Sequence, residues 1–146
     1  MSTGAIYIGG ARLIDGSGEP PPGGPQALLI EGERITAVGP QAELPPPPGA
    51  RVIDAGGMTV MPGLIDCHVH LANLGGGMVA RAAIPPSLAV FLAAESFRQT
   101  LEAGITSVRD ASGVDLGMKM AVERGLIPGP RLKISVNIIC QFGGHN

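Results

Sequence analysis

The sequence predicts an α/β protein in two parts, a small β-rich module over residues 1–60 and alternating strands and helices over residues 61–146. Short apolar runs separated by glycine and proline turns indicate the first part, because such turns end β-strands. From residue 61, strand-like runs alternate with stretches whose apolar residues recur at helical spacing, which is typical of β/α units. Hydrophobic residues make up 45% of the chain and the mean hydropathy is +0.30, so the chain can bury a core.

Length and charge exclude several classes of protein. The 146 residues match one average domain, and a net charge of -2 offers no basic surface for nucleic acid. No segment reaches the length of a membrane span and no signal peptide is visible, so we expect a cytoplasmic protein without membrane or nucleic-acid partners. Cys67 and Cys140 lie in apolar strand-like runs, which predicts two buried thiols rather than a disulfide.

The β-rich module is expected to contain two antiparallel hairpins. Gly9-Gly10 separates one pair of strand-like runs and Glu31-Gly32-Glu33 separates another, and glycine is favoured in tight turns of this kind. The proline-rich and glycine-rich stretches 19–25 and 44–49 cannot continue a ladder, so they are predicted to be surface loops. The predicted strands are residues 6–8, 12–14, 27–30, 34–38, 51–54 and 58–61.

Two histidines stand at the end of the next strand. His68 and His70 are two positions apart, so their side chains should share one face, opposite Val69. Two converging imidazoles are half of a zinc site, since catalytic zinc needs at least three protein ligands and an open position. The alternative is that both histidines cap the strand and hydrogen-bond to nearby carbonyls. The third histidine, His145, also follows a strand-like run, and this shared placement favours the metal site.

The first helix is expected after a glycine-containing loop over residues 71–84. Gly75-Gly76-Gly77 in that loop lacks the spacing of a phosphate-binding motif. Pro85-Pro86-Ser87 starts the helix, with Ser87 as a plausible cap, and Gly104 ends it in the position that favours a left-handed residue. The helix carries an apolar stripe formed by Val90, Ala94, Phe97 and Leu101.

The second β/α unit has a carboxylate at the end of its strand. Residues 105–108 read as the strand, and Asp110 follows at its C-terminal end. The favoured interpretation is that Asp110 orients the turn, while a carboxylate directed toward the histidines remains the functional alternative. Residues 112–115 fit a capping box for a helix that runs to about Arg124 and stops at Gly125.

The third strand is predicted over residues 131–139. Apolar residues alternate with polar ones along it, whereas fully buried parallel strands are usually continuously apolar. Ser135 and Asn137 therefore have the register to face a polar interior.

The chain resembles the amidohydrolase superfamily. The resemblance begins with Val60-Met61-Pro62-Gly63-Leu64-Ile65-Asp66-Cys67-His68-Val69-His70-Leu71, preceded by the β-rich module, which looks like the first barrel strand of that superfamily. Thr106-Ser107-Val108-Arg109-Asp110 and Gly143-Gly144-His145 further resemble its imidazolonepropionase-like and Xaa-Arg dipeptidase or prolidase-like branch. The resemblance covers essentially the whole chain. It implies part of a small β-sandwich over residues 1–60, followed over residues 61–146 by the first part of a metal-dependent (β/α)8 TIM barrel.

Particular residues match the motifs of this family. His68 and His70 match its paired metal ligands, and Asp66 matches a structural acidic residue before them. His145 matches a histidine that faces the substrate, which implies a catalytic role at the oxyanion. Asn146 departs from the glycine that commonly follows. The remaining ligands and the aspartate general base of the family come from its fourth, fifth, sixth and eighth strands, beyond Asn146.

The resemblance implies a metal-dependent hydrolase that cleaves amide or related C–N bonds through a metal-bound hydroxide. Zn²⁺ is the expected metal, and the substrate would be a dipeptide, cyclic amide or imidazolone. A full barrel needs about 250 residues, so we expect about three of eight β/α units here, in an N-terminal portion that is inactive alone. Homo-oligomerisation of the full-length enzyme is left open. Two alternatives are a non-catalytic metal-binding or interaction module that uses the His-x-His pair, and a barrel that has lost its metal chemistry.

Overall fold

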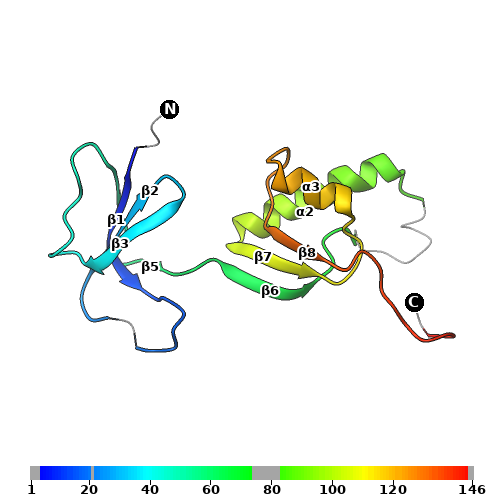
Figure 1. Ribbon diagram of the computed structural model, residues 1–146, viewed down its shortest axis with the longest axis horizontal. Coiled ribbons are helices and arrows are strands. Elements are labelled where there is room, and N and C mark those ends of the chain that lie inside the picture. The colour runs from blue at the N-terminus through cyan, green and yellow to red at the C-terminus, as the bar shows by residue number, and fades with distance from the viewer. Residues whose placement is uncertain (1–3, 21, 74–82, 145–146) are drawn as a thin grey trace. The chain divides into compact units, whose positions relative to one another are not determined.

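The computed structural model describes residues 4–20, 22–73 and 83–144 and has a mixed α/β architecture, as the sequence predicts (Figure 1). It divides into two compact units, Met1–Pro62 and Gly63–Asn146. His145 and the Gly75-Gly76-Gly77 segment lie outside the described residues. No described helix is long and apolar enough to cross a membrane.

The first unit is a five-stranded sheet. Its central path has the order β3-β2-β1-β4, and β5 pairs separately with β1. Neighbours along β3-β2-β1 are antiparallel, whereas β4 and β5 run parallel to β1. The hairpin predicted around Gly32 is confirmed, because Glu31 pairs with Arg34 and Gly32 has a φ of 62°. The strands are β1 (Ile6–Leu13), β2 (Gln26–Glu31), β3 (Arg34–Pro40), β4 (Arg51–Asp54) and β5 (Thr59–Val60).

The turn predicted at Gly9-Gly10 is wrong, because β1 passes straight through it. The register with β2 shifts between Ile8 and Ala11, and Gly10 has a φ of 81°, so the glycine pair forms a β-bulge. The two halves of β1 stay in one strand because β4 pairs with the first half and β5 with the second.

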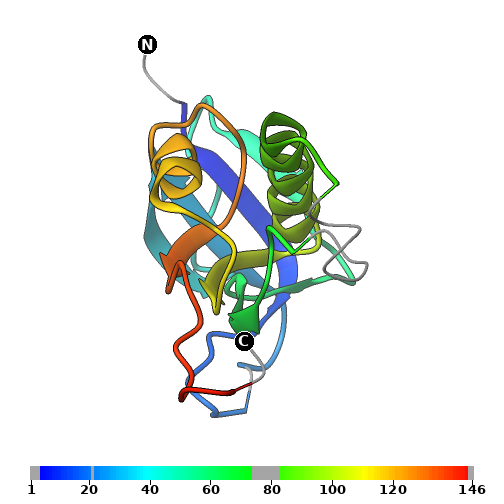
Figure 2. The same ribbon diagram turned by 90° about the vertical axis from the view of Figure 1, so that its right-hand side faces the viewer.

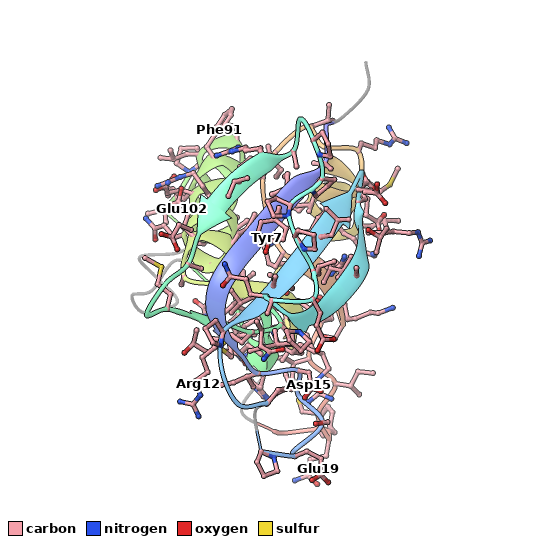
Figure 3. All side chains as sticks on the ribbon, turned by 90° about the vertical axis from the view of Figure 1, so that its left-hand side faces the viewer. Tyr7, Arg12, Asp15, Glu19, Phe91 and Glu102 are labelled. Atoms are coloured by element: carbon pink, nitrogen blue, oxygen red, sulfur yellow. The ribbon has the colours of Figure 1, made fainter. Side chains whose placement is uncertain are left out.

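Small residues and one tyrosine form the core of this unit. Tyr7 is buried, and its hydroxyl donates to the Leu44 carbonyl at 2.8 Å, which ties down the 44–49 loop (Figure 3). Gln26 is also buried, and its amide donates to the carbonyls of Gly23 and Gly24. Both buried polar side chains therefore have hydrogen-bond partners, as burial requires. The buried apolar residues are Tyr7, Ala11, Ala27, Leu28 and Ala55.

The second unit is a parallel β-α-β-α-β arrangement, which is the pattern that a (β/α)8 barrel repeats. Its sheet has the order β6-β7-β8, and both helices cover the same face of it (Figures 1 and 2). The core between sheet and helices contains Ala93, Phe97, Val108, Val114 and Leu132. The elements are β6 (Leu64–Val69), α2 (Pro86–Glu102), β7 (Ile105–Asp110), α3 (Leu116–Glu123) and β8 (Arg131–Ile134).

Helix α2 begins without a side-chain cap. Pro86 is its first residue and Pro85 holds the N-cap position, so the predicted cap at Ser87 is wrong. Proline suits the first helical position because its missing N–H would have no intrahelical acceptor there. At the other end, Gly104 follows the C-cap with a φ of 86°, which confirms its predicted role.

Helix α3 is capped by Asp115 rather than by Ser112. The Asp115 carboxylate accepts the Met118 N–H at 2.8 Å, so the helix starts later than the predicted capping box requires. Ser112 instead lies beside His70. Gly125, with a φ of 68°, follows the helix as predicted.

Strand β8 is shorter than predicted and ends at Ile134. The N–H of Asn137 donates to the Ser135 carbonyl at 2.8 Å across Val136, whose φ is 66°. This i to i+2 bond is a γ-turn with positive φ, a strained geometry, especially for a β-branched residue. Because β8 ends at Ile134, the continuous apolar pattern of a buried parallel strand is not required of the residues after it.

Candidate functional site

The rings of His68 and His70 lie next to each other at the C-terminal end of β6. Their centroids are 5.3 Å apart and the ring planes are inclined by 78°, an edge-to-face arrangement. The carboxyl end of a parallel sheet is where enzymes built from β/α units place their reactive groups. The two imidazoles that the sequence singles out are thus brought together there.

A β-bulge contains the first of the two histidines, His68, together with Cys67. Asp66 pairs with Val108 and Val69 pairs with Asp110, so β6 has one more residue than β7 between these two pairs. Simple alternation along the strand therefore does not hold over this stretch. Bulges commonly re-aim side chains beside active sites.

Two side chains bind the backbone around the bulge. The Asp66 carboxylate accepts the N–H of His68 at 3.0 Å, and Arg109 Nε donates to the Cys67 carbonyl at 2.6 Å. These bonds partner polar groups where the ladder is interrupted. Asp66 thus has a structural contact directly at the first histidine.

His70 is held through its Nδ1 atom. This nitrogen is 3.2 Å from Ser112 Oγ and 3.4 Å from the Ser112 carbonyl oxygen. A hydrogen bond at Nδ1 leaves Nε2 as the nitrogen that can bind a ligand, the same arrangement that orients metal-binding histidines. His68 is exposed, and no hydrogen bond to its ring is found within the described part of the chain.

Asp110 joins the loops that follow the strands. It is fully buried, and its Oδ2 accepts the Leu71 N–H at 2.8 Å while its Oδ1 accepts the Val114 N–H at 3.3 Å. Its main-chain carbonyl accepts the Ser135 N–H at 3.1 Å. The prediction that Asp110 orients the turn is confirmed, and both carboxylate oxygens are engaged by backbone donors.

An open cavity of about 520 Å³ lies beside His68. Ser135 and Asn137, which the sequence placed toward a polar interior, both line it. Sequence reasoning missed Arg109 and Lys133, although each alternates with core residues along its strand and so had a readable signal. The full lining is His68, Arg109, Asp110, Ala111, Lys133, Ile134, Ser135, Asn137, Ile138 and Ile139.

The described residues contain no group of three or more His, Cys, Asp or Glu side chains that could hold a metal. The predicted substrate histidine, His145, lies outside these residues. Cys67 and Cys140 form no disulfide, as expected, but both are exposed rather than buried. Among the described residues, the predicted metal ligands are therefore the two histidines.

The marked pKa shifts lie away from this site, on exposed surfaces. Hydrogen bonds from Arg98 and then Gln99 lower the pKa of Glu95 to about 2, and Glu95 in turn raises the pKa of Arg98. In the first unit, hydrogen bonds from Ser17 lower the pKa of Asp15. These shifts report surface structure rather than catalytic tuning.

Similarity to known proteins extends over most of the chain. Residues 59–139 match the amidohydrolase family. An imidazolonepropionase of Pseudomonas aeruginosa is 34% identical over 147 residues, covering 78% of this chain and 36% of that protein. The crystal structure of a prolidase complexed with N-methylphosphonate-L-proline superposes with a TM-score of 0.84 at 37% identity, covering 97% of this chain and 34% of the prolidase. The crystal structure of an amidohydrolase gives a TM-score of 0.85 at 35% identity, with 97% and 33% coverage. The chain spans about a third of the length of these relatives.

Proposed function

This chain belongs to the amidohydrolase family, and from that premise we propose that it supplies the metal-binding strand of a hydrolase acting on amide or related C–N bonds. The observation that carries the proposal is the pair of adjacent rings, His68 and His70, at the carboxyl end of a parallel strand. In a (β/α)8 barrel, whose first three β/α units we propose residues 61–146 to form, this edge holds the active site.

The described residues can supply part of the ligand set of a divalent metal. Imidazole nitrogens suit zinc, and the Ser112 contact at Nδ1 leaves Nε2 of His70 available. Catalytic zinc takes at least three protein ligands. We therefore propose His68 and His70 as two ligands of Zn²⁺, with the others contributed from outside the described residues.

The bound metal would act as a Lewis acid, lowering the pKa of water and polarising the scissile carbonyl. In this chain, His68 and His70 would hold it. Ser112 orients the His70 ring, and Asp66 and Asp110 fix the backbone at His68 and directly after His70. The cavity beside His68 gives a substrate room to approach. We assign His145 the donation of a hydrogen bond to the developing oxyanion, by its match to the family motif.

The proposed substrate is a small molecule of the dipeptide or cyclic-amide type. The proteins similar to this chain include an imidazolonepropionase and a prolidase. These names support a substrate that contains an amide or related C–N bond.

Metal content tests the proposal. Elemental analysis of the purified 146-residue chain, beside the complete product of its gene, should find near-stoichiometric zinc in the complete product and little in the chain alone. His68→Ala and His70→Ala should each lower zinc content and abolish metal-dependent hydrolysis in the complete product. As a matched control, His145→Ala should slow hydrolysis and leave zinc content unchanged.

Two outcomes would contradict the proposal. Tight stoichiometric metal in the 146-residue chain alone, without hydrolysis by the complete product, would indicate a self-sufficient, non-catalytic metal module. Absence of metal from both proteins after reconstitution with zinc would indicate a barrel that has lost its metal chemistry.

A further inference from the structure

Two cationic residues on neighbouring strands line the cavity beside His68. The register of the parallel pair β7–β8 places Arg109 directly opposite Lys133, and both side chains line the cavity. Two cationic side chains that line one cavity on neighbouring strands repel each other. The pair therefore has an electrostatic cost that a bound anion would relieve.

No carboxylate in the described part of the chain neutralises this pair. Neither Arg109 nor Lys133 forms an ion pair there, and Arg109 uses Nε for the Cys67 carbonyl. Its terminal guanidinium nitrogens therefore remain available for a ligand. The acidic residue that lines the cavity is Asp110, whose two carboxylate oxygens already accept backbone N–H groups. The cavity thus carries an excess of positive charge next to His68.

The rest of the lining suits an organic anion better than a bare ion. Ser135 and Asn137 add a hydroxyl and an amide, whereas Ile138 and Ile139 add apolar surface. Arginine and lysine bind carboxylates through charge-assisted hydrogen bonds, and the guanidinium is matched to the two oxygens of a carboxylate. A molecule with a carboxylate at one end and an apolar body satisfies both parts of the lining.

We propose that Arg109 and Lys133 bind the carboxylate of the substrate, which makes the substrate a carboxylate-bearing amide. This inference rests on the proposed function, because it takes the cavity beside His68 to be the substrate site. Anchoring the carboxylate between the two strands would position the rest of the molecule toward His68. Lys133 is then a specificity-determining residue, while Arg109 also supports the bulge.

Ligand binding to the complete gene product tests this directly and does not require turnover. The probes are N-acetylalanine and its amide, N-acetylalaninamide, which differ in the carboxylate, with affinity measured by ligand-observed NMR. Lys133→Gln should weaken N-acetylalanine binding by about 10- to 100-fold, the loss expected for a charged hydrogen bond. It should leave N-acetylalaninamide binding unchanged, and Lys133→Arg should retain N-acetylalanine binding.

Lys119→Gln provides the matched control. Lys119 is the other lysine of the chain, pairs with Glu123 on α3 and does not line the cavity beside His68. Its loss should not change the affinity for N-acetylalanine. Equal binding of the acid and the amide, or unchanged binding in Lys133→Gln, would overturn the inference. Inorganic phosphate binding as tightly as N-acetylalanine would also overturn it, in favour of a general anion site.

Hydrolysis separates this inference from the proposed function. Selective binding of N-acetylalanine without hydrolysis of any amide by the zinc-loaded protein would contradict the hydrolase and leave the carboxylate site standing. Hydrolysis of amides with no preference for a carboxylate would contradict the carboxylate site and leave the hydrolase standing.

Discussion

The two units of the molecule both contain a sheet, but their polar residues are organised differently. In Met1–Pro62 the central strands are antiparallel, so the ends of successive strands alternate between the two edges of the sheet. In Gly63–Asn146 all three strands are parallel, and the residues that follow each strand meet at one edge. A parallel sheet therefore gathers polar residues from distant parts of the sequence at one edge, which is why the candidate site lies in the second unit.

Gln26 and Asp110, the buried polar side chains other than the Tyr7 hydroxyl that reaches Leu44, differ in how far along the chain their hydrogen-bond partners lie. In the first unit, Gln26 bonds to Gly23 and Gly24, its neighbours in sequence. In the second, Asp110 bonds to Leu71, 39 positions away, as well as to Val114. Gln26 thus closes a local turn, whereas Asp110 connects the loops of different strands.

Substitution of Asp110 should cause the largest loss of unfolding free energy among the variants that test this comparison. Asp110→Ala leaves two backbone N–H groups without their acceptor in a buried place, so we expect a loss of about 3–5 kcal/mol in unfolding free energy. Gln26→Ala should cost about 1 kcal/mol, because its contacts are local. Urea unfolding of both variants measures the difference. An Asp110→Ala loss no larger than that of Gln26→Ala would show that the long-range connection does not matter for stability.

Steric crowding in the first sheet should give the next largest effect. A Cβ added at Gly9 would lie 2.7 Å from the Tyr7 ring, so Gly9→Ala should destabilise by about 1–3 kcal/mol. Gly39→Ala is the control, since a Cβ at Gly39 meets nothing within 4 Å. Thermal unfolding followed by circular dichroism should show a lower midpoint for Gly9→Ala alone. Equal midpoints for the two variants would contradict the packing at the bulge.

Relief of the strained turn after β8 should increase stability, by less than the losses expected for Asp110→Ala and Gly9→Ala. Val136→Gly should raise the unfolding free energy by about 1 kcal/mol, because release of about 1–3 kcal/mol of strain exceeds the entropy cost of glycine. Ile138→Gly, at an exposed position without positive φ, should instead be neutral or slightly destabilising. Destabilisation by Val136→Gly similar to that of Ile138→Gly would argue against strain at this turn.

The smallest expected effect is the pH dependence of an exposed ion pair on α2. Glu95 has a pKa of about 2 in the folded protein against 4.5 ordinarily, because of Arg98 and Gln99. A carboxylate with a lowered pKa stabilises the fold above pH 4.5, and this contribution is lost as the pH falls toward 2. The difference in thermal midpoint between the wild type and Glu95→Gln should therefore shrink over that interval, and also in 1 M salt. Glu33→Gln is the control, because Glu33 forms no ion pair within the described part. A difference that stays constant with pH would contradict the role of this pair.

Much of the local structure could be predicted from the sequence. The hairpin at Gly32, the end of α2 at Gly104 and the strand before Asp110 follow from glycine's access to positive φ and from short-range patterns of apolar residues. The spacing of His68 and His70 likewise singled out the pair whose rings are adjacent in the structure.

The predictions that failed depended on which strands become neighbours. Gly9-Gly10 has the composition of a turn, but pairing with β4 and β5 keeps both halves of β1 in one strand. Ser112 has the spacing of a helix cap, but in the fold its side chain contacts His70, 42 positions away in sequence.

By itself, the sequence determined the hairpin at Gly32, the glycines that follow both helices, the histidine pair and the family, because these depend on local backbone preferences and on residues close in the chain. The apolar stripe predicted for α2 is buried only in part, since Phe97 is buried whereas Val90 and Leu101 are exposed.

Only the tertiary structure decided the bulge at Cys67 and His68, the contacts of Ser112 and Asp110 with the histidine loop, and the opposition of Arg109 and Lys133. Those features depend on strand register. Register is set by the packing and hydrogen bonding of segments far apart in sequence, and a shift of one residue would reverse which side chains face the cavity.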